Sequence, residues 1–143
     1  MYSIGAGGGS VAWIDSGGLL KVGPESVGSD PGPACYGKGT KAALTDAFLI
    51  CHYLNPNRFA SGNMKLYRER SEEALLPVAE YLGTDVEQAA DQMIQVALAN
   101  MYTELSNVME QNGFDPREFS LMAFGGAGPV SYTHLRAHET GRN

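Results

Sequence analysis

The sequence has 143 residues, of which 43% are hydrophobic and 18% are charged, and this is the composition of one ordinary globular domain. The formal net charge of −6 argues against sequence-independent binding to nucleic acid or to an anionic membrane. No apolar stretch approaches the roughly 20 residues that cross a bilayer, the N-terminus lacks the features of a signal peptide, and two cysteines do not indicate a disulfide framework. We therefore expect a cytoplasmic protein.

The first third of the chain is rich in glycine and is expected to contain a hairpin and a long loop. In residues 10–22, the β-prone runs VAWI and LLKV flank the turn-forming residues DSGG, which predicts a β-hairpin. Residues 23–41 form a long segment of glycine and proline, and such a segment in a compact domain is usually functional or an interface. Eleven of the eighteen glycines fall in the first 39 residues with no element before them, so the start of the chain looks cut.

Two helices are expected in the middle of the chain. Thr45 or Asp46 could cap a short apolar helix, AFLICHYL, over residues 47–54. Ser71 is a suitable N-cap for a second helix with the sequence EEALLPVAEYL, and Gly83 is suited to end it in a left-handed conformation.

The longest predicted helix covers residues 85–111. Thr84 and Glu87 have the spacing of a capping box, and Gly113 is expected to end the helix. Its apolar positions recur with a period close to 3.6 residues: Val86, Ala90, Met93, Ala97, Met101, Leu105 and Val108. The apolar run at residues 119–124 predicts a short buried strand. Helices that lead into a buried strand and a glycine turn indicate an α/β fold.

The glycine run GAGGGS at residues 5–10 nearly fits the dinucleotide fingerprint G-x-G-x-x-G. Ser10 stands where the last glycine is needed, no strand precedes the run, and a strand rather than a helix follows it. These departures argue against a Rossmann site. The run suits a close backbone crossing or a ligand contact equally well, and Gly7, Gly8, Gly9 and Ser10 are the candidate contact residues.

The string GPACYGKG is a near miss to a phosphate-binding P-loop. Gly39 stands where the motif needs a magnesium-binding hydroxyl, and Pro33 removes an N–H group that would cradle phosphate. Cys35 has no base evident in the sequence, so packing is the simpler role for it than nucleophilic catalysis. Asp46 could be a helix cap or a site carboxylate, and it is the one weak catalytic candidate. The sequence predicts no metal site.

The string FGGAGP is the strongest chemical signal in the sequence. An apolar run ends in small residues before Pro129, and proline is allowed in the first turn of a following helix. Glycines at such a turn let the backbone lie against a flat ring or a phosphate. The candidate cofactor-binding residues are Gly125, Gly126, Ala127 and Gly128.

Taken together, the motifs resemble the large subunit of the hydantoinase A/5-oxoprolinase family. The matching strings occur in order from Ile4 to Pro129, and they are IGAGGGSVAWID, GGLLKVGPESVGSDPGPACYGKG, LTDAFL, LNPNRF and NGFDPREFSLMAFGGAGP. The most specific element is GSDPGPACYG followed by TDA. The resemblance implies a fragment of an actin-like (ribonuclease H-like) ATPase domain.

By the same resemblance, the turn at residues 125–128 is the adenosine motif of that domain. The family's two phosphate-binding turns lie upstream of this segment. ATP and Mg²⁺ are therefore expected to bind the full-length parent, and this fragment alone is not expected to hold either of them. Phe48 stands where the family usually has asparagine, and Tyr67 stands where it usually has aspartate. The first departure weakens a polar role beside Asp46.

The chain departs from the family after Pro129. Where the family continues with a helix of small residues, this chain reads VSYTHLRAHET. This string resembles the in-frame translation of a transposon-end sequencing adapter. We therefore interpret residues 1–129 as a partial family domain and residues 130–143 as a non-native tail. His134 and His138 are spaced as a helical metal pair, but a zinc site would need a third ligand.

The resemblance implies that the parent protein opens a small cyclic amide, a hydantoin or 5-oxoproline, at the expense of ATP. The family works with a B-type subunit, so a protein partner is expected. One alternative is the corresponding subunit of an ATP-dependent acetone or acetophenone carboxylase, which shares these motifs. Another is that the 143-residue polypeptide has no activity by itself.

Overall fold

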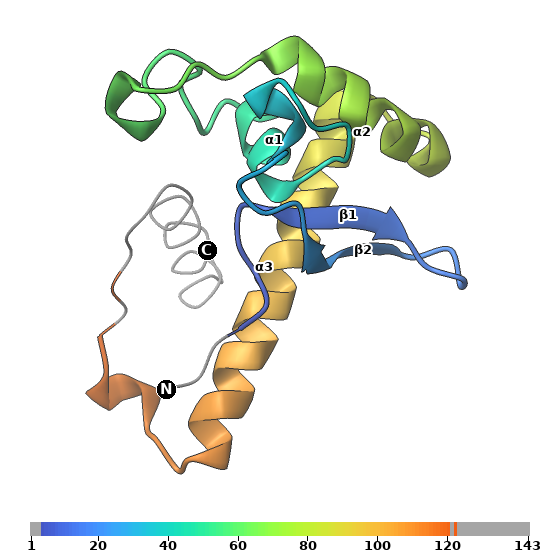
Figure 1. Ribbon diagram of the computed structural model, residues 1–143. Coiled ribbons are helices and arrows are strands. Elements are labelled where there is room, and N and C mark those ends of the chain that lie inside the picture. Colours follow the sequence, from blue (N-terminus) through green and yellow to red (C-terminus); the bar gives the residue numbers. More distant parts are fainter. Residues whose placement is uncertain (1–3, 121, 123–143) are drawn as a thin grey trace. The chain divides into compact units, whose positions relative to one another are not determined.

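The structure is a computed structural model, and it describes residues 4–120 and 122. Over this range it contains a two-stranded sheet, three α-helices and short 3-10 turns (Figure 1). The chain divides into two compact units, of which the larger is residues 5–97. In the other unit, the structure describes Ile4, residues 98–120 and Met122. The presence of both helices and a sheet confirms the predicted α/β class.

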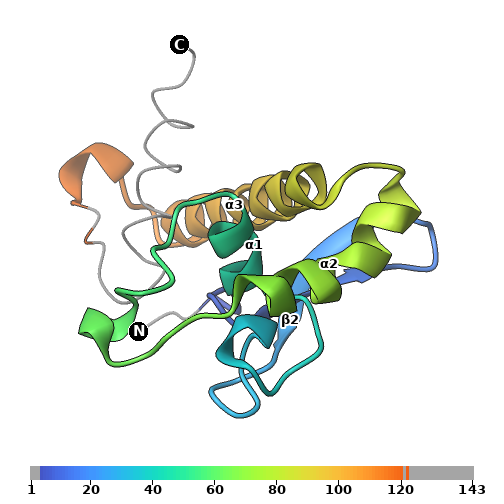
Figure 2. The same cartoon turned by 90° about the horizontal axis from the view of Figure 1, so that it is seen from above.

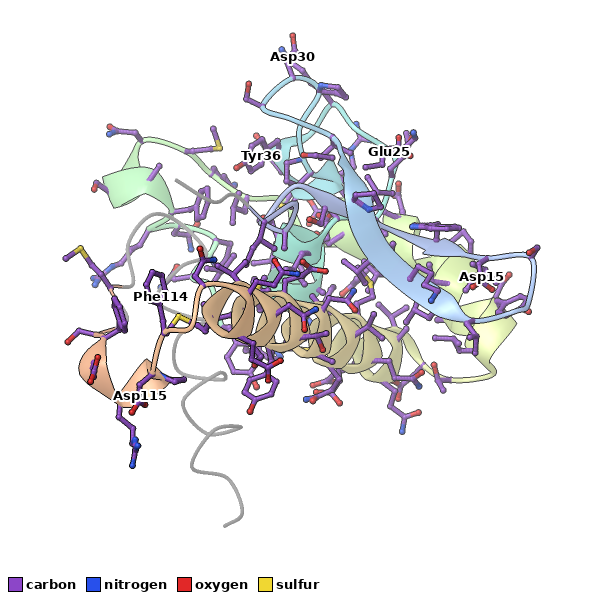
Figure 3. All side chains as sticks on the ribbon, turned by 90° about the horizontal axis from the view of Figure 1, so that it is seen from below. Asp15, Glu25, Asp30, Tyr36, Phe114 and Asp115 are labelled. Carbon is purple, nitrogen blue, oxygen red and sulfur yellow. The ribbon has the colours of Figure 1, made fainter. Side chains whose placement is uncertain are left out.

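The predicted hairpin is present as β1 (Ser10–Ile14) and β2 (Leu20–Ser26), which pair antiparallel. The register pairs Ala12 with Val22, Trp13 with Lys21, and Ile14 with Leu20. Asp15 closes the turn, shown in Figure 3, because its Oδ1 accepts the N–H groups of Gly17 and Leu19, both at 2.9 Å. The acidic residue of the DSGG string therefore fixes the turn.

The first helix, α1 (Leu44–Ile50), begins three residues earlier than predicted and also ends earlier. Asp46 lies inside the first turn, and its carboxylate reaches back to the N–H of Ala43, so it does not hold the cap position itself. The helix stops before His52, whose φ of 64° is left-handed. All seven residues of α1 are buried, which makes it the central element of the larger unit.

The second helix, α2 (Arg68–Leu82), also begins earlier than predicted. Its N-cap is Tyr67, and Ser71 lies within the helix with its side chain buried. The prediction of Ser71 as the cap was wrong because this hydroxyl binds a group on another element. Gly83 ends α2 with a φ of 70°, which confirms the predicted left-handed end.

The third helix, α3 (Val86–Gln111), begins one residue later than predicted, ends at the predicted residue, and appears as one long helix in Figures 1 and 2. The cap is Asp85 rather than Thr84, since the Asp85 carboxylate accepts the N–H of Gln88 at 2.7 Å. Gly113 follows the helix with a φ of 67°, as the sequence predicts. Three positions of the predicted apolar face are buried in the larger unit: Ala90, Met93 and Ala97.

The core of the larger unit surrounds α1, which contacts both α2 and β1. Figures 1 and 2 both show α1 beside α2. The chain just before α1 also joins the sheet, because the N–H of Ala12 donates to the carbonyl of Ala42 at 2.9 Å. One apolar cluster, Cys35, Leu49 and Leu66, lies under the glycine- and proline-rich loop. A second connects α2 with the start of α3 and contains Val78, Ala79 and Ala89.

The buried strand predicted at residues 119–124 is not found at the positions that the structure describes. Phe119, Ser120 and Met122 are exposed and have no strand conformation, and the other three residues lie outside the described range. A strand needs a neighbour to bond its N–H and C=O groups. Within the described residues, the only sheet is the pair of β1 and β2.

Candidate functional site

The glycine- and proline-rich loop turns back at η1 (Ala34–Tyr36), where two N–H groups point at one carboxylate. The N–H of Ala34 donates to Oδ2 of Asp46 at 3.0 Å, and the N–H of Cys35 donates to Oδ1 at 2.8 Å. Both donors lie at the start of a helical turn, where backbone N–H groups have no partner within the helix. Asp46 therefore holds this loop against α1.

Two further donors complete the surroundings of Asp46. The N–H of Ala43 donates to Oδ2 at 2.9 Å, and the hydroxyl of Ser71 donates to Oδ1 at 2.6 Å. The carboxylate is fully buried, and among the described residues no cation forms an ion pair with it. Three backbone donors and one hydroxyl stabilise the buried carboxylate in place of a cation.

This arrangement limits the chemistry of Asp46. Two carboxylate oxygens offer about four acceptor positions, and four donors occupy them. A general base or a metal ligand needs a lone pair that faces the substrate or the ion. The geometry thus favours a positioning role for Asp46, while its role in catalysis stays a prediction.

The two thiols are poor nucleophiles in this environment. Burial raises the pKa of Cys35 strongly, and the negative charge of the adjacent Asp46 raises it further. Burial likewise raises the pKa of Cys51 to about 11, with additional contributions from Asp91 and Glu87. Since the thiolate is the reactive form, neither cysteine is activated at neutral pH.

The glycine run at residues 5–10 crosses the start of α1 at close range. The carbonyl of Gly8 accepts both the N–H of Thr45 at 2.9 Å and its hydroxyl at 2.8 Å. The hydroxyl of Ser10 accepts the N–H of Gly7 at 3.0 Å. A Cβ at Gly9 would lie 2.6 Å from the hydroxyl oxygen of Ser26. The run therefore has a clear packing role, and contact with a cofactor stays a prediction.

Several predicted site residues lie outside the described range, namely Gly125, Gly126, Ala127, Gly128, His134 and His138. Among the residues that the structure does describe, no group of three or more His, Cys, Asp or Glu side chains could hold a metal ion. In the same residues, no helix is long and apolar enough to cross a membrane.

An open groove of about 590 Å³ lies between α2 and the start of α3, and its lining is strongly acidic. We call it the acidic groove, and its carboxylates are Glu69, Glu72, Glu73, Asp85 and Glu87. The one basic side chain in its lining, Arg68, bonds Glu72 at 3.2 Å and the carbonyl of Leu49 at 3.0 Å. No sequence pattern indicates this groove, because its glutamates fit the acidic first turn of a helix.

Two buried hydroxyl groups, that of Ser71 beside Asp46 and that of Thr45 beside Gly8, have partners that no pattern in the sequence indicates. Ser71 has the spacing of a helix cap, and Thr45 stands where a cap for α1 was expected. Their actual partners, Asp46 and Gly8, lie 25 and 37 residues away along the chain. Only contacts between elements reveal these roles.

The fold and the site define a small α/β segment in which a buried carboxylate joins a glycine- and proline-rich loop to two helices. A family model described as Hydantoinase/oxoprolinase matches residues 1–141. The chain is 40% identical over 141 residues to the caprolactamase subunit alpha of Pseudomonas jessenii, covering 97% of this chain and 20% of that protein. It is 39% identical over 137 residues to the acetophenone carboxylase gamma subunit of Aromatoleum aromaticum, covering 94% and 19%.

The crystal structure of the ATP-dependent caprolactamase from Pseudomonas jessenii agrees with this fold. The TM-score is 0.83 at 41% sequence identity, over 96% of this chain and 20% of that one. The chain belongs to the hydantoinase/oxoprolinase family, which confirms the resemblance found in the motifs. It spans about a fifth of the length of these relatives. The predicted boundary at Pro129 lies outside the described residues and stays a prediction.

Proposed function

We propose that the complete protein containing this segment opens a cyclic amide ring at the expense of ATP. The observation that carries this proposal is the family match over residues 1–141, together with 40% identity to a caprolactamase subunit. A hydantoin and 5-oxoproline are the substrates that the motifs favour, and the caprolactamase relative supports the wider class of cyclic amides.

ATP with Mg²⁺, when bound, would supply phosphorylation of the amide oxygen, which makes the ring carbonyl carbon electrophilic and the oxygen a good leaving group. No described residues form a group that could hold Mg²⁺, so in this proposal the metal and the phosphates are held by other parts of the parent protein. The residues that would contact adenosine are Gly125, Gly126, Ala127 and Gly128. A position within an actin-like ATPase domain is part of the same proposal.

The described residues contribute positioning rather than proton transfer in this proposal. Asp46 fixes the glycine- and proline-rich loop through Ala34 and Cys35, and Thr45 fixes the glycine run through Gly8. Both attachments are made by the first turn of α1, so a single buried helix sets the positions of two glycine-rich segments.

A protein partner is the second part of the proposal. The two relatives carry subunit designations, alpha for the caprolactamase and gamma for the acetophenone carboxylase. By this likeness we propose that the parent protein works with a B-type subunit, and that the isolated 143-residue chain is inactive.

The test is to express the complete reading frame together with its neighbouring subunit gene. We expect ADP release that depends on 5-oxoproline, hydantoin or caprolactam, with the ring-opened product found by mass spectrometry. Turnover that proceeds without ATP would contradict the proposal. Calorimetric titration of the 143-residue chain with Mg-ATP should show no micromolar binding, and clear binding would overturn the inactive-fragment part.

A second candidate function is ATP-dependent carboxylation of a ketone. It is supported by the 39% identity to the acetophenone carboxylase gamma subunit, which is nearly equal to the identity with the caprolactamase subunit. The same preparation decides between the two. Product formation from acetone or acetophenone that requires bicarbonate would establish carboxylation, and ring opening without bicarbonate would establish the amide reaction.

A further inference from the structure

The glycine run is attached to α1 by one residue that makes two hydrogen bonds. The N–H of Thr45 lies in the first turn of α1, where backbone N–H groups have no partner within the helix, and it donates to the carbonyl of Gly8 at 2.9 Å. The Thr45 hydroxyl donates to the same oxygen at 2.8 Å. Both lone pairs of that oxygen are thus occupied, and Thr45 is only 5% exposed. The attachment is internal to the larger unit and needs no group from outside it.

The next glycine of the run holds the part of the glycine- and proline-rich loop that follows β2. The carbonyl of Gly9 accepts the N–H of Val27 at 2.9 Å. The hydroxyl of Ser26 accepts the N–H of Gly28 at 3.1 Å, and a Cβ at Gly9 would lie 2.6 Å from that hydroxyl oxygen. A glycine at this position therefore allows the two backbones to approach closely.

The far end of this stretch of loop is held by the residue next to Thr45. Asp46 accepts two N–H groups of η1, at 3.0 and 2.8 Å. Thr45 and Asp46 are adjacent in α1, and Gly8 and Gly9 are adjacent in the glycine run. Hydrogen bonds therefore form a closed ring that joins the glycine run, the loop of residues 27–35 and the first turn of α1.

This ring fixes the base of the loop rather than its tip. Figure 3 shows Asp30 at the tip, where it is exposed, whereas the first two residues of η1 are buried. Two side chains take part in the ring, those of Thr45 and Asp46. Because Asp46 also holds α2, its replacement disturbs several elements at once. Removal of the Thr45 hydroxyl is more selective, since the N–H bond to Gly8 stays in place.

We propose that Thr45 is a positioning residue for the proposed reaction, and that its hydroxyl couples the glycine run to the loop of residues 27–35 so that the two segments keep one relative position. The reaction part of this inference rests on the proposed function, whereas the coupling rests on the contacts above. Glycine-rich backbone can approach a ligand closely because no Cβ intervenes. A displacement of about 1 Å in a segment that orients a substrate can lower turnover by about two orders of magnitude. Thr45 acts through Gly8 and touches no reactant.

Amide hydrogen exchange of the complete protein, read by mass spectrometry, tests the coupling. Thr45→Val keeps the shape of the side chain and the backbone bond but removes the hydroxyl. Relative to the buried part of α3 around Met93, exchange should rise about three- to tenfold in the glycine run and also in the peptides that contain Val27 and Cys35. Thr45→Ser keeps the hydroxyl and should restore exchange at all of these positions.

The matched control is Thr84→Val, which removes a threonine hydroxyl at the start of α3. That hydroxyl donates to the carbonyl of Asp85 at 3.2 Å and lies outside the ring. Exchange in both segments should stay within about 1.5-fold of wild type. ATP-dependent ring opening by the complete enzyme should fall at least about tenfold in Thr45→Val, recover in Thr45→Ser and stay unchanged in Thr84→Val.

Each part of the inference has its own contrary result. A rise in exchange confined to the glycine run, with the loop unchanged, would overturn the coupling. An equal rise around Met93 would reveal general destabilisation and would overturn it as well. Full turnover in Thr45→Val despite looser segments would overturn the positioning role. If the wild-type enzyme opens no cyclic amide, the proposed function fails alone, and the exchange data still decide whether the two segments are coupled.

Discussion

The hydroxyl of Ser71 donates a 2.6 Å hydrogen bond to Oδ1 of Asp46, which joins α2 to α1 across 25 residues of sequence. Both side chains are fully buried. This bond and the two N–H donors of η1 meet on one carboxylate, so the loop and both helices have a common attachment. A change at this point should affect all three together.

Replacing the central carboxylate should destabilise the chain strongly. In Asp46→Asn, an NH₂ group takes the place of one oxygen and faces donors that then have no acceptor. We expect the free energy of unfolding to fall by about 2–4 kcal/mol. Urea denaturation, monitored by far-UV circular dichroism, measures this free energy of unfolding. Asp91→Asn, at an exposed position, is the control and should change the value by less than about 0.5 kcal/mol.

Removing the hydroxyl should have a smaller effect that is coupled to the first. Ser71→Ala takes one donor from a charged acceptor, so we expect a loss of about 1–3 kcal/mol. In the double variant Asp46→Asn/Ser71→Ala, the loss of stability should be clearly smaller than the sum of the two single losses, because both changes remove the same hydrogen bond. Strict additivity in the denaturation data would show that the bond contributes nothing.

Two glycines of the loops provide a matched pair of substitutions. A Cβ at Gly39 would lie 2.5 Å from the carbonyl oxygen of Gly32, whereas a Cβ at Gly7 meets nothing within 4 Å. Gly39→Ala should therefore cost about 1–3 kcal/mol of stability, since backbone must shift. Gly7→Ala should be neutral or slightly stabilising. Thermal melts of the two variants should rank in that order, and the reverse order would contradict the packing described for the loop.

The thiols should be unreactive in the folded chain. Burial raises the pKa of Cys51 from 9.0 to about 11 and that of Cys35 still further, so little thiolate exists at about pH 8. Ellman's reagent should react slowly until denaturant is added. Because the unfolded thiol loses its proton first, stability should fall as pH rises between about 9 and about 11. Fast labelling of the native chain at about pH 8 would contradict this burial.

Two adjacent residues, Thr84 and Asp85, could cap the start of α3, and their substitutions should have different costs. Asp85→Ala removes the acceptor for the N–H of Gln88 and should cost about 1 kcal/mol. Thr84→Ala removes a hydroxyl whose bond goes to the carbonyl of Asp85, so its cost should stay below about 0.5 kcal/mol. Equal costs in urea denaturation would restore Thr84 to the predicted capping role.

Local patterns predicted the elements whose ends are set by nearby residues. The DSGG turn places Asp15 within reach of Gly17 and Leu19, and Gly83 and Gly113 end their helices in left-handed conformations. The starts of the helices were predicted less well. A serine that could cap α2 donates instead to a carboxylate on α1, and local patterns do not distinguish these partners.

The same limit applies to the candidate site. Asp46 was identified as a carboxylate of interest, but its four donors come from three places in the chain, namely η1, the residue before α1, and α2. The predicted strand at residues 119–124 failed at Phe119, Ser120 and Met122 for a related reason, because a strand depends on a neighbour that the pattern of one segment does not specify.

The sequence by itself determined the family, through motif strings in a fixed order, and the local elements, through periodicity, turn residues and glycines. Those features act over a few residues and can be recognised one segment at a time. Only the tertiary structure decided which groups surround the Asp46 carboxylate. Hydrogen bonds that span 11, 12 and 25 residues form when packing brings separate elements together, and that proximity is a property of the folded chain.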